Sequence, residues 1–216
     1  MIRNIIFDFG NVLFDLDLAA FERDMRNLWG ENFASAKENL LRERVFELYE
    51  TGGLSTAEFV GKLCRASDPV LTPQQVSGAW NAIFIGMPQH RFDLLLRLRQ
   101  RYKVFLLSNI NGLHENWIAD YMLRGTDNCR GDYESRYFDG VYFSHLIRLR
   151  KPMLEAFEYV LADAELVAKE TVFFDDLPEN VEAARQVGIQ GIWHEPGTEI
   201  EERLVEMQLL PRLKNL

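Results

Sequence analysis

The chain has 216 residues, 47% of them hydrophobic and 26% charged, with a formal net charge of −9. A chain of this size can bury a substantial core, either as one large domain or as one domain with an inserted subdomain. The acidic balance and the lack of a basic stripe in the sequence argue against a nucleic-acid backbone as partner.

The cysteine pattern and the N-terminal region indicate the compartment. Cys64 and Cys129 lie far apart, without the spacing of a zinc site or a redox motif, and two free thiols suit a reducing environment. Asp8 stands where a signal peptide would stay apolar, and no stretch approaches the length of a membrane span. We therefore expect a cytoplasmic protein that does not associate with membranes.

The first apolar stretch, Ile2 to Phe7, predicts a short buried strand that ends at Asp8. Gly10-Asn11 directly after it is a turn signal. Helical spacing of apolar residues then continues for about seventy residues. One expected helix begins at Asp17, and a second runs from about Ala34 to Glu50. A third begins at a capping box formed by Ser55 and Glu58, and a fourth begins at Thr72-Pro73, with proline at the first helical position.

After this block the pattern alternates between helix and strand. Such alternation predicts a parallel sheet of the doubly wound kind. The stretch 124–139 is polar and is expected to be a surface excursion. Expected strands cover 103–107, 140–143, 171–174 and 189–193, and expected helices cover 92–101, a segment from 112, 152–162, 179–187 and 199–209.

The block between the first two strands is too long for one crossover, so an inserted all-helical subdomain explains it. The predicted fold class is therefore α/β: a doubly wound, mainly parallel, Rossmann-like sheet with an all-helical cap. Residues 1–15 and 87–216 are expected to form the core, and residues 16–86 the cap.

Polar residues follow several of the predicted strands. Asp8 ends the first, Ser108-Asn109 the second, and Asp175-Asp176 the fourth, while Lys151 comes shortly after the third. Pro152 suits the first position of a helix and would place Lys151 at its N-terminus. Because the carboxyl ends of parallel strands meet at one sheet edge, we expect these side chains to converge there.

Their chemistry fits one task. Carboxylates gathered at one point repel each other unless a cation lies between them, and ligands that offer only oxygen suit Mg²⁺. A lysine and a serine hydroxyl offer donors to an anion. Together these groups indicate phosphoryl transfer through an aspartyl phosphate on Asp8. Each residue also has a plainer interpretation: a turn residue at Asp8, a helix N-cap at Asp175-Asp176 or Ser108, and a surface charge at Lys151.

The four motifs, taken in order, resemble the haloacid dehalogenase superfamily, chiefly its Mg²⁺-dependent phosphatases with a helical cap after the first motif. The motifs are Asp8-Phe9-Gly10-Asn11-Val12, Leu106-Leu107-Ser108-Asn109, Arg150-Lys151-Pro152, and Phe173-Phe174-Asp175-Asp176 followed by Asn180. The resemblance implies that Asp8 is the nucleophile and a metal ligand, and that Lys151, Ser108 and Asn109 bind phosphate. It also implies that Asp176 and the carbonyl of Gly10 hold Mg²⁺, supported by Asp175 and Asn180.

The chain departs from this pattern at Gly10, where most such phosphatases carry a second acid that protonates the leaving group. Such a group contributes roughly 10²–10⁴-fold. Three interpretations stay open: a leaving oxygen that needs little protonation, a replacement acid at Asp15, Asp17 or elsewhere in the cap, or a weak enzyme. The first agrees with a similarity to bacterial α-D-glucose-1-phosphatases, whose cap resembles the stretch from Glu50-x-Gly52 to Glu58-Phe59.

The sequence thus predicts a Mg²⁺-dependent phosphatase acting on a small phosphorylated metabolite, with a sugar phosphate such as a sugar 1-phosphate favoured. One alternative is a metal-independent 2-haloacid dehalogenase, against which the Asp175-Asp176 pair speaks. A non-catalytic protein that binds a phosphorylated ligand is another. A phosphomutase is disfavoured, because it must protonate and deprotonate substrate hydroxyls. The sequence leaves open a monomer or a small homo-oligomer.

Overall fold

The computed structural model describes residues 1–66, 68–122 and 130–211. Within these ranges one parallel sheet has the strand order β5-β4-β1-β6-β7. The chain starts at the central strand, builds outward to one side and then to the other, so the sheet is doubly wound as predicted. The strands are β1 (Asn4–Phe7), β4 (Lys103–Ser108), β5 (Gly140–Phe143), β6 (Thr171–Asp175) and β7 (Gln190–Trp193).

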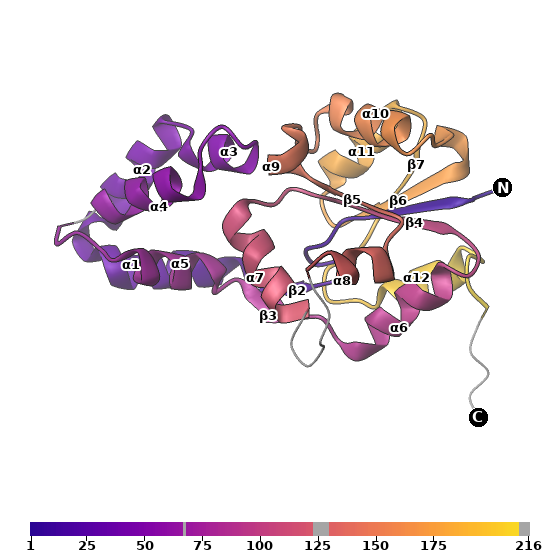
Figure 1. Cartoon of the computed structure of the whole chain (residues 1–216), viewed down its shortest axis with the longest axis horizontal. Coiled ribbons are helices and arrows are strands. Elements are labelled where there is room, and N and C mark those ends of the chain that lie inside the picture. The colour runs from indigo at the N-terminus through magenta and orange to yellow at the C-terminus, as the bar shows by residue number, and fades with distance from the viewer. Residues whose placement is uncertain (67, 123–129, 212–216) are drawn as a thin grey trace.

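Both faces of this sheet are covered, which is why its strands read as continuous apolar runs. In β1, Ile5 and Phe7 point into one core cluster and Ile6 into the cluster on the opposite face. Helices lie above and below the sheet in Figure 1. One face carries α10 (Leu154–Asp163) and α11 (Pro178–Gln186), and the other carries α6 (Gln89–Leu98), α8 (Arg130–Tyr137) and α12 (Ile200–Glu206).

The helices of residues 18–81 gather to one side of the sheet, beyond its carboxyl edge (Figure 1). They enclose a separate apolar cluster that includes Met25, Trp29, Phe59 and Trp80. The Ser55–Glu58 capping box is present as predicted. These elements are α1 (Leu18–Trp29), the 3-10 turn η1 (Gly30–Asn32), α2 (Phe33–Arg42), α3 (Val45–Glu50), α4 (Thr56–Arg65) and α5 (Pro73–Asn81). The division into a core of 1–15 and 87–216 and a cap of 16–86 stays a prediction.

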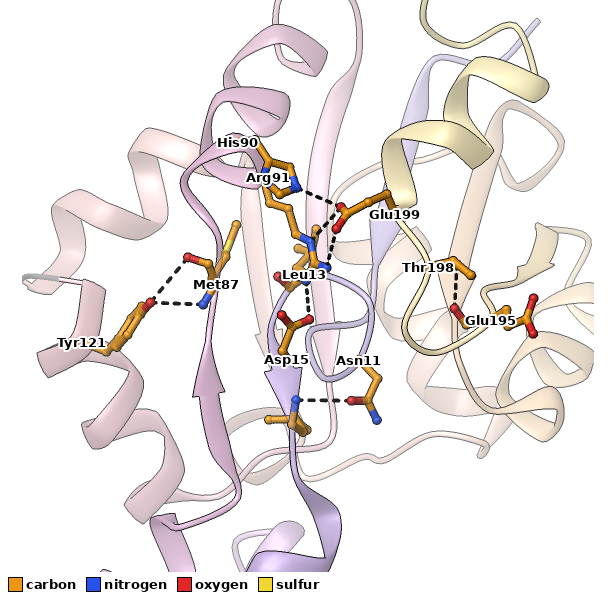
Figure 2. Close-up of polar contacts among 11 residues, drawn as sticks. Asn11, Leu13, Asp15, Met87, His90, Arg91, Tyr121, Glu195, Thr198 and Glu199 are labelled. Atoms are coloured by element: carbon orange, nitrogen blue, oxygen red, sulfur yellow. Dashed lines mark hydrogen bonds and ion pairs between the residues drawn. The ribbon is translucent and has the colours of Figure 1, made fainter.

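The chain enters and leaves these helices through a short antiparallel ribbon, β2 (Asp15–Leu16) and β3 (Phe84–Gly86). Figure 2 shows the contacts that hold it. Arg91 on α6 reaches the carboxylate of Asp15 at 2.7 Å and that of Glu199, which precedes α12, at 3.2 Å. The hydroxyl of Tyr121 accepts from the backbone N–H of Met87. The connection is therefore attached to the core on both sides.

Three predicted elements differ in the structure. The helix expected from 34 to 50 is broken between α2 and α3, where Arg44 has φ 53°. The helix expected at 152 starts only at Leu154, so Pro152 is not at its first position, and the short helix α9 (Ser144–Ile147) follows β5. Part of the expected excursion at 124–139 forms α8; residues 124–129, which include Cys129, lie outside the described ranges.

Cys64 is buried in the helical subdomain as a free thiol. Over the ranges that the structure describes, no helix combines the length and the apolar character needed to cross a membrane. The helix α7 (Gly112–Met122) follows β4 and therefore begins at the carboxyl edge of the sheet.

Candidate active site

A cavity of about 300 Å³ opens at the carboxyl edge of the sheet, between the strand ends and the helical subdomain. The strand ends contribute Asp8, Ser108 and Asp176, and the loop after α9 contributes Lys151. The sequence reasoning expected this convergence, because parallel strands all present their carboxyl ends at one edge. Gly10, Asn109 and Asn180 also line the cavity.

Three carboxylates meet at this edge. Asp8, Asp175 and Asp176 each offer an oxygen, and these oxygens lie within 4.8 Å of one another. Asp175 is fully buried, whereas Asp8 and Asp176 face the cavity. An all-oxygen set of this kind is what Mg²⁺ prefers, so the residues fit the ion that the sequence implied.

Lys151 lies between two of these acids. Its side chain is 1% exposed, and its Nζ is 2.7 Å from Asp8 Oδ1 and 2.6 Å from Asp175 Oδ2. Asn109 fixes the lysine from its backbone, since its amide donates to the Lys151 carbonyl and accepts from the Lys151 N–H, each at 2.9 Å. The side chain of Asn109 is thereby committed to Lys151.

Asp175 and Asp176 differ in the hydrogen bonds that they accept. Asp175 accepts from the backbone N–H of Leu177 at 2.8 Å and from Asn180 Nδ2 at 2.9 and 3.0 Å, in addition to Lys151. Its lone pairs are therefore largely used. Asp176 accepts from Asn11 Nδ2 at 3.2 Å and keeps the remaining capacity of its carboxylate. Asp8 and Asp176 are thus better placed than Asp175 to ligate a metal directly.

The electrostatics of the site call for a cation. Burial raises the pKa of Asp8 to about 7, with Lys151 opposing the shift and the charge of Asp175 adding to it. Burial also raises the pKa of Asp176. For Lys151, burial acts to lower the pKa, but the charges of Asp8 and Asp175 outweigh it and raise the pKa above its usual value. One ammonium group does not balance three carboxylates.

The two acids suggested as replacements for the one missing at Gly10 do not line this cavity. Asp15 is paired with Arg91. Asp17 caps α1 by accepting from the backbone N–H of Ala19, and it pairs with Arg23 at 2.8 Å. Their carboxylates belong to the ribbon and to the first helix, so neither serves the reacting centre.

A model of the haloacid dehalogenase-like hydrolases matches residues 2–188. The chain is a haloacid dehalogenase-like hydrolase. D-ribitol-5-phosphate phosphatase from Bacteroides thetaiotaomicron is 28% identical over 207 residues, which cover 94% of this chain and 97% of the relative.

Solved structures of the family resemble it over nearly their whole length. A haloacid dehalogenase family enzyme from Bacteroides thetaiotaomicron, crystallised with magnesium and inorganic phosphate, has a TM-score of 0.82 at 29% identity, covering 94% of this chain and 99% of that one. A predicted haloacid dehalogenase-like hydrolase from Porphyromonas gingivalis has a TM-score of 0.80 at 29% identity, covering 99% and 100%.

In this haloacid dehalogenase-like hydrolase the cavity also contains residues to which sequence reasoning gave no role. Asn11 joins Asp176 to the loop after the first motif, because its Oδ1 also accepts from the Leu16 N–H at 3.3 Å. Glu50, His114 and Arg150 line the cavity as well. The Gly10-Asn11 turn was a usable signal for Asn11, and the motif that contains Lys151 was one for Arg150. The position of Glu50 depends on how the helical subdomain packs.

Proposed function

We propose that the protein is a Mg²⁺-dependent phosphatase that hydrolyses a small phosphorylated metabolite. The observation that carries the proposal is the placement of Asp8, Asp176 and Lys151 at one cavity, with three carboxylate oxygens within 4.8 Å of one another. Two acids facing a cavity beside one buried ammonium suit an anionic substrate only when a further cation is present. A phosphate ester with Mg²⁺ meets that requirement.

The proposed roles follow from the contacts. Asp8 attacks phosphorus, and Lys151 neutralises phosphate oxygens from its fixed position beside the nucleophile. Ser108, buried at the end of β4, donates its hydroxyl to the phosphate. Asp8, Asp176 and the carbonyl of Gly10 would hold Mg²⁺, with Asp175 and Asn180 supporting that set. Bound Mg²⁺ supplies positive charge that offsets the repulsion between Asp8 and the substrate.

Asn109 has a different role in this scheme from the one the family resemblance implied. Both ends of its amide are used on the backbone of Lys151. We assign it to positioning the lysine, and contact with phosphate to Ser108 and Lys151.

The substrate that we favour is a phosphorylated sugar or sugar alcohol. The similar enzyme from Bacteroides thetaiotaomicron acts on D-ribitol 5-phosphate. A cavity of about 300 Å³ accommodates a molecule of that class. A sugar 1-phosphate is a narrower alternative, which the absence of an acid at Gly10 suggested.

The test is phosphate release from sugar 1-phosphates, sugar 5- and 6-phosphates, polyol phosphates and nucleotides, with Mg²⁺ and with EDTA. We expect turnover that EDTA abolishes and Mg²⁺ restores. Asp8→Asn should lower kcat by about 10³-fold or more, because it removes the nucleophile. The matched control is Asp17→Asn, which changes an acid of the helix cap outside the cavity and should keep wild-type turnover.

Other outcomes identify the rival functions. Release of halide from 2-haloacids in the presence of EDTA would indicate a metal-independent dehalogenase. Tight binding of phosphate esters without release of phosphate would indicate a ligand-binding protein. Full activity of Asp8→Asn would overturn the proposal.

A further inference from the structure

A leaving group that departs as an alkoxide needs a proton, and Gly10 supplies none. Asp15 and Asp17 are outside the cavity. Among the described residues that line it, the groups able to give up a proton near neutral pH, apart from the proposed metal ligands and the two permanent cations, are His114 and Glu50. The choice lies between these two.

His114 is committed to a neutral structural role. Its Nδ1 lies 3.2 Å from the amide nitrogen of Asn111, from which it accepts, and its Nε2 lies 3.1 Å from the carbonyl of Trp80, to which it donates. Both ring nitrogens are therefore used. Burial lowers the pKa of His114 to about 4, so the ring is neutral at neutral pH, and its remaining N–H proton is bound to the Trp80 carbonyl.

Glu50 is the last residue of α3, and the surrounding backbone is attached to the core. Its carbonyl accepts from the buried hydroxyl of Ser144 at 2.7 Å. Two residues later, Gly52 has φ +70°, and a Cβ there would lie 2.4 Å from the carbonyl oxygen of His145. On the preceding side, the hydroxyl of Tyr49 accepts from the Leu113 N–H at 2.8 Å. Figure 1 shows α3 beside α9 accordingly.

The carboxyl group of Glu50 is held at the cavity by one cation. Arg150 Nη2 lies 3.2 Å from Glu50 Oε2, and the two side chains are 33% and 27% exposed. Burial raises the pKa of Glu50; Arg150 opposes that shift and the charge of Glu47 adds to it. The buried Nε of Arg150 has no hydrogen-bond partner. Arg150 is adjacent in sequence to Lys151, so it links the subdomain acid to the phosphate-binding loop.

The position of Glu50 suits the geometry of the displacement. In an in-line attack the leaving oxygen lies on the side of phosphorus opposite the nucleophile. Asp8 lies at the sheet edge, whereas Glu50 lines the same cavity from the helices beyond that edge, as Figure 1 shows for α3. A phosphate bound by Ser108 and Lys151 therefore presents its leaving group toward the helical subdomain.

We propose that Glu50 is the proton donor to the leaving group, in the place of the acid absent at Gly10; this rests on the proposed phosphatase function. A carboxylate oxygen of Asp8 forms a bond to phosphorus while the bond from phosphorus to the ester oxygen breaks. The ester oxygen takes that electron pair and the proton of Glu50, and leaves as an alcohol. Water then forms a bond to phosphorus and gives a proton to Glu50, while the bond from phosphorus to the Asp8 oxygen breaks. This step restores the Asp8 carboxylate and releases hydrogen phosphate. Arg150 stabilises the Glu50 carboxylate between the two steps.

The test compares Glu50→Gln with the wild type on phenyl phosphates whose ring substituents vary the leaving group from 4-nitrophenol to phenol. These esters carry no extra hydroxyls, so recognition of substrate hydroxyls does not enter. Glu50→Gln should lose roughly 10²-fold or more in kcat/KM on phenyl phosphate and less than about 10-fold on 4-nitrophenyl phosphate, whose leaving group needs little protonation. The ratio kcat/KM is the readout because it reports the transfer to Asp8, whereas kcat also contains the hydrolysis step that all these esters share. Retained turnover of the nitrophenyl ester shows that the variant is folded.

Glu43→Gln is the matched control. Glu43 also lies in the helical subdomain and pairs with one cation, Lys62 at 2.7 Å, but it does not line the cavity. It should keep the wild-type dependence on the leaving group. An equal loss on all esters, or no loss on any, in Glu50→Gln would overturn the role of Glu50 while the phosphatase function stands. A wild-type protein that hydrolyses none of these esters would overturn both.

Discussion

At the scale of single residues, Lys151 organises the site. Its ammonium is almost fully buried, yet it stays charged because Asp8 and Asp175 lie on either side of it. The side-chain amide of Asn109 fixes the position of Lys151 by hydrogen bonding to the Lys151 backbone. A buried cation that cannot move keeps one oxygen of Asp8 oriented and leaves the cavity side of that acid available. In the proposed reaction, the same fixed charge neutralises an incoming phosphate without reorganisation.

Gly10 gives a residue-scale prediction. A Cβ at this position would lie 2.6 Å from Leu16 Cδ1, the flexible end of a side chain, so Gly10→Asp should fold after a small shift of Leu16. In the wild-type background the change should raise kcat/KM on phenyl phosphate by less than about 10-fold, because Glu50 already supplies the proton. In the Glu50→Gln background it should restore at least about 10-fold of the lost activity.

The readout is kcat/KM for phenyl and 4-nitrophenyl phosphate in the two single variants and the double variant. A double variant no better than Glu50→Gln would argue against proton supply as the defect. A large gain in the wild-type background would indicate that the native site lacks a donor.

The residues that sequence predicts well are those that follow strands. Asp8, Ser108 and Asp176 each come directly after an apolar run, and a parallel sheet brings such positions together however far apart they are in the chain. Glu50 has no such marker. It ends a helix, and tertiary contacts bring it to the cavity, such as that of its carbonyl with Ser144 across 94 residues of sequence. Local pattern carries no information about that contact.

At the scale of elements, Arg91 connects three segments: the ribbon that leads to the helical subdomain, the start of α6, and the turn before α12 (Figure 2). Its guanidinium is 6% exposed and donates to the Leu13 carbonyl at 3.1 Å, to Asp15 and to Glu199. The ribbon therefore has a fixed attachment close to the nucleophile loop. Sequence periodicity does not predict this ribbon, because two- and three-residue strands are too short to show a period.

Arg91→Met tests this attachment. Methionine keeps much of the volume but leaves the Leu13 carbonyl unpaired, while Asp15 and Glu199, each 42% exposed, can be rehydrated. The cost should lie between that of a surface pair and that of a fully buried pair, at about 2 kcal/mol of unfolding free energy. The measurement is urea unfolding. Arg203→Gln, which breaks an exposed pair with Glu206, should cost less than about 0.5 kcal/mol, and an equal loss in both variants would contradict the argument.

Two of the predicted helices differ from the structure for reasons that the backbone shows. Arg44 adopts a left-handed conformation in the middle of the apolar pattern from 34 to 50, and no glycine or proline marks that break. At Pro152 the sequence showed a residue suited to the start of a helix, but α10 begins two residues later. Lys151, directly before Pro152, bonds to Asn109 through its backbone, so a tertiary contact holds this stretch outside the helix.

At the scale of the whole molecule, the acids Asp8, Asp175 and Asp176 lie together at the cavity between the sheet and the helical subdomain. Their mutual repulsion lowers the stability of the folded state. The unfolded chain separates them, so any cation that binds only the folded site stabilises the fold. Mg²⁺ should therefore raise the unfolding free energy, by about 2.7 kcal/mol at a free concentration of 100 times its Kd.

The pH dependence of this stabilisation follows from Asp8. Its pKa rises from 3.8 to about 7 in the folded protein, so between these values the folded state holds a proton that the unfolded state has released. Stability without metal should fall as pH rises through that window. Mg²⁺ takes the place of the proton, so its stabilising effect should be larger at pH 8 than at pH 5. Thermal unfolding with Mg²⁺ or EDTA at both pH values measures this difference, which Asp8→Asn should reduce and Asp17→Asn should preserve. Equal Mg²⁺ shifts at the two pH values would mean that the metal and the proton do not compete for Asp8, and would remove Asp8 from the metal site.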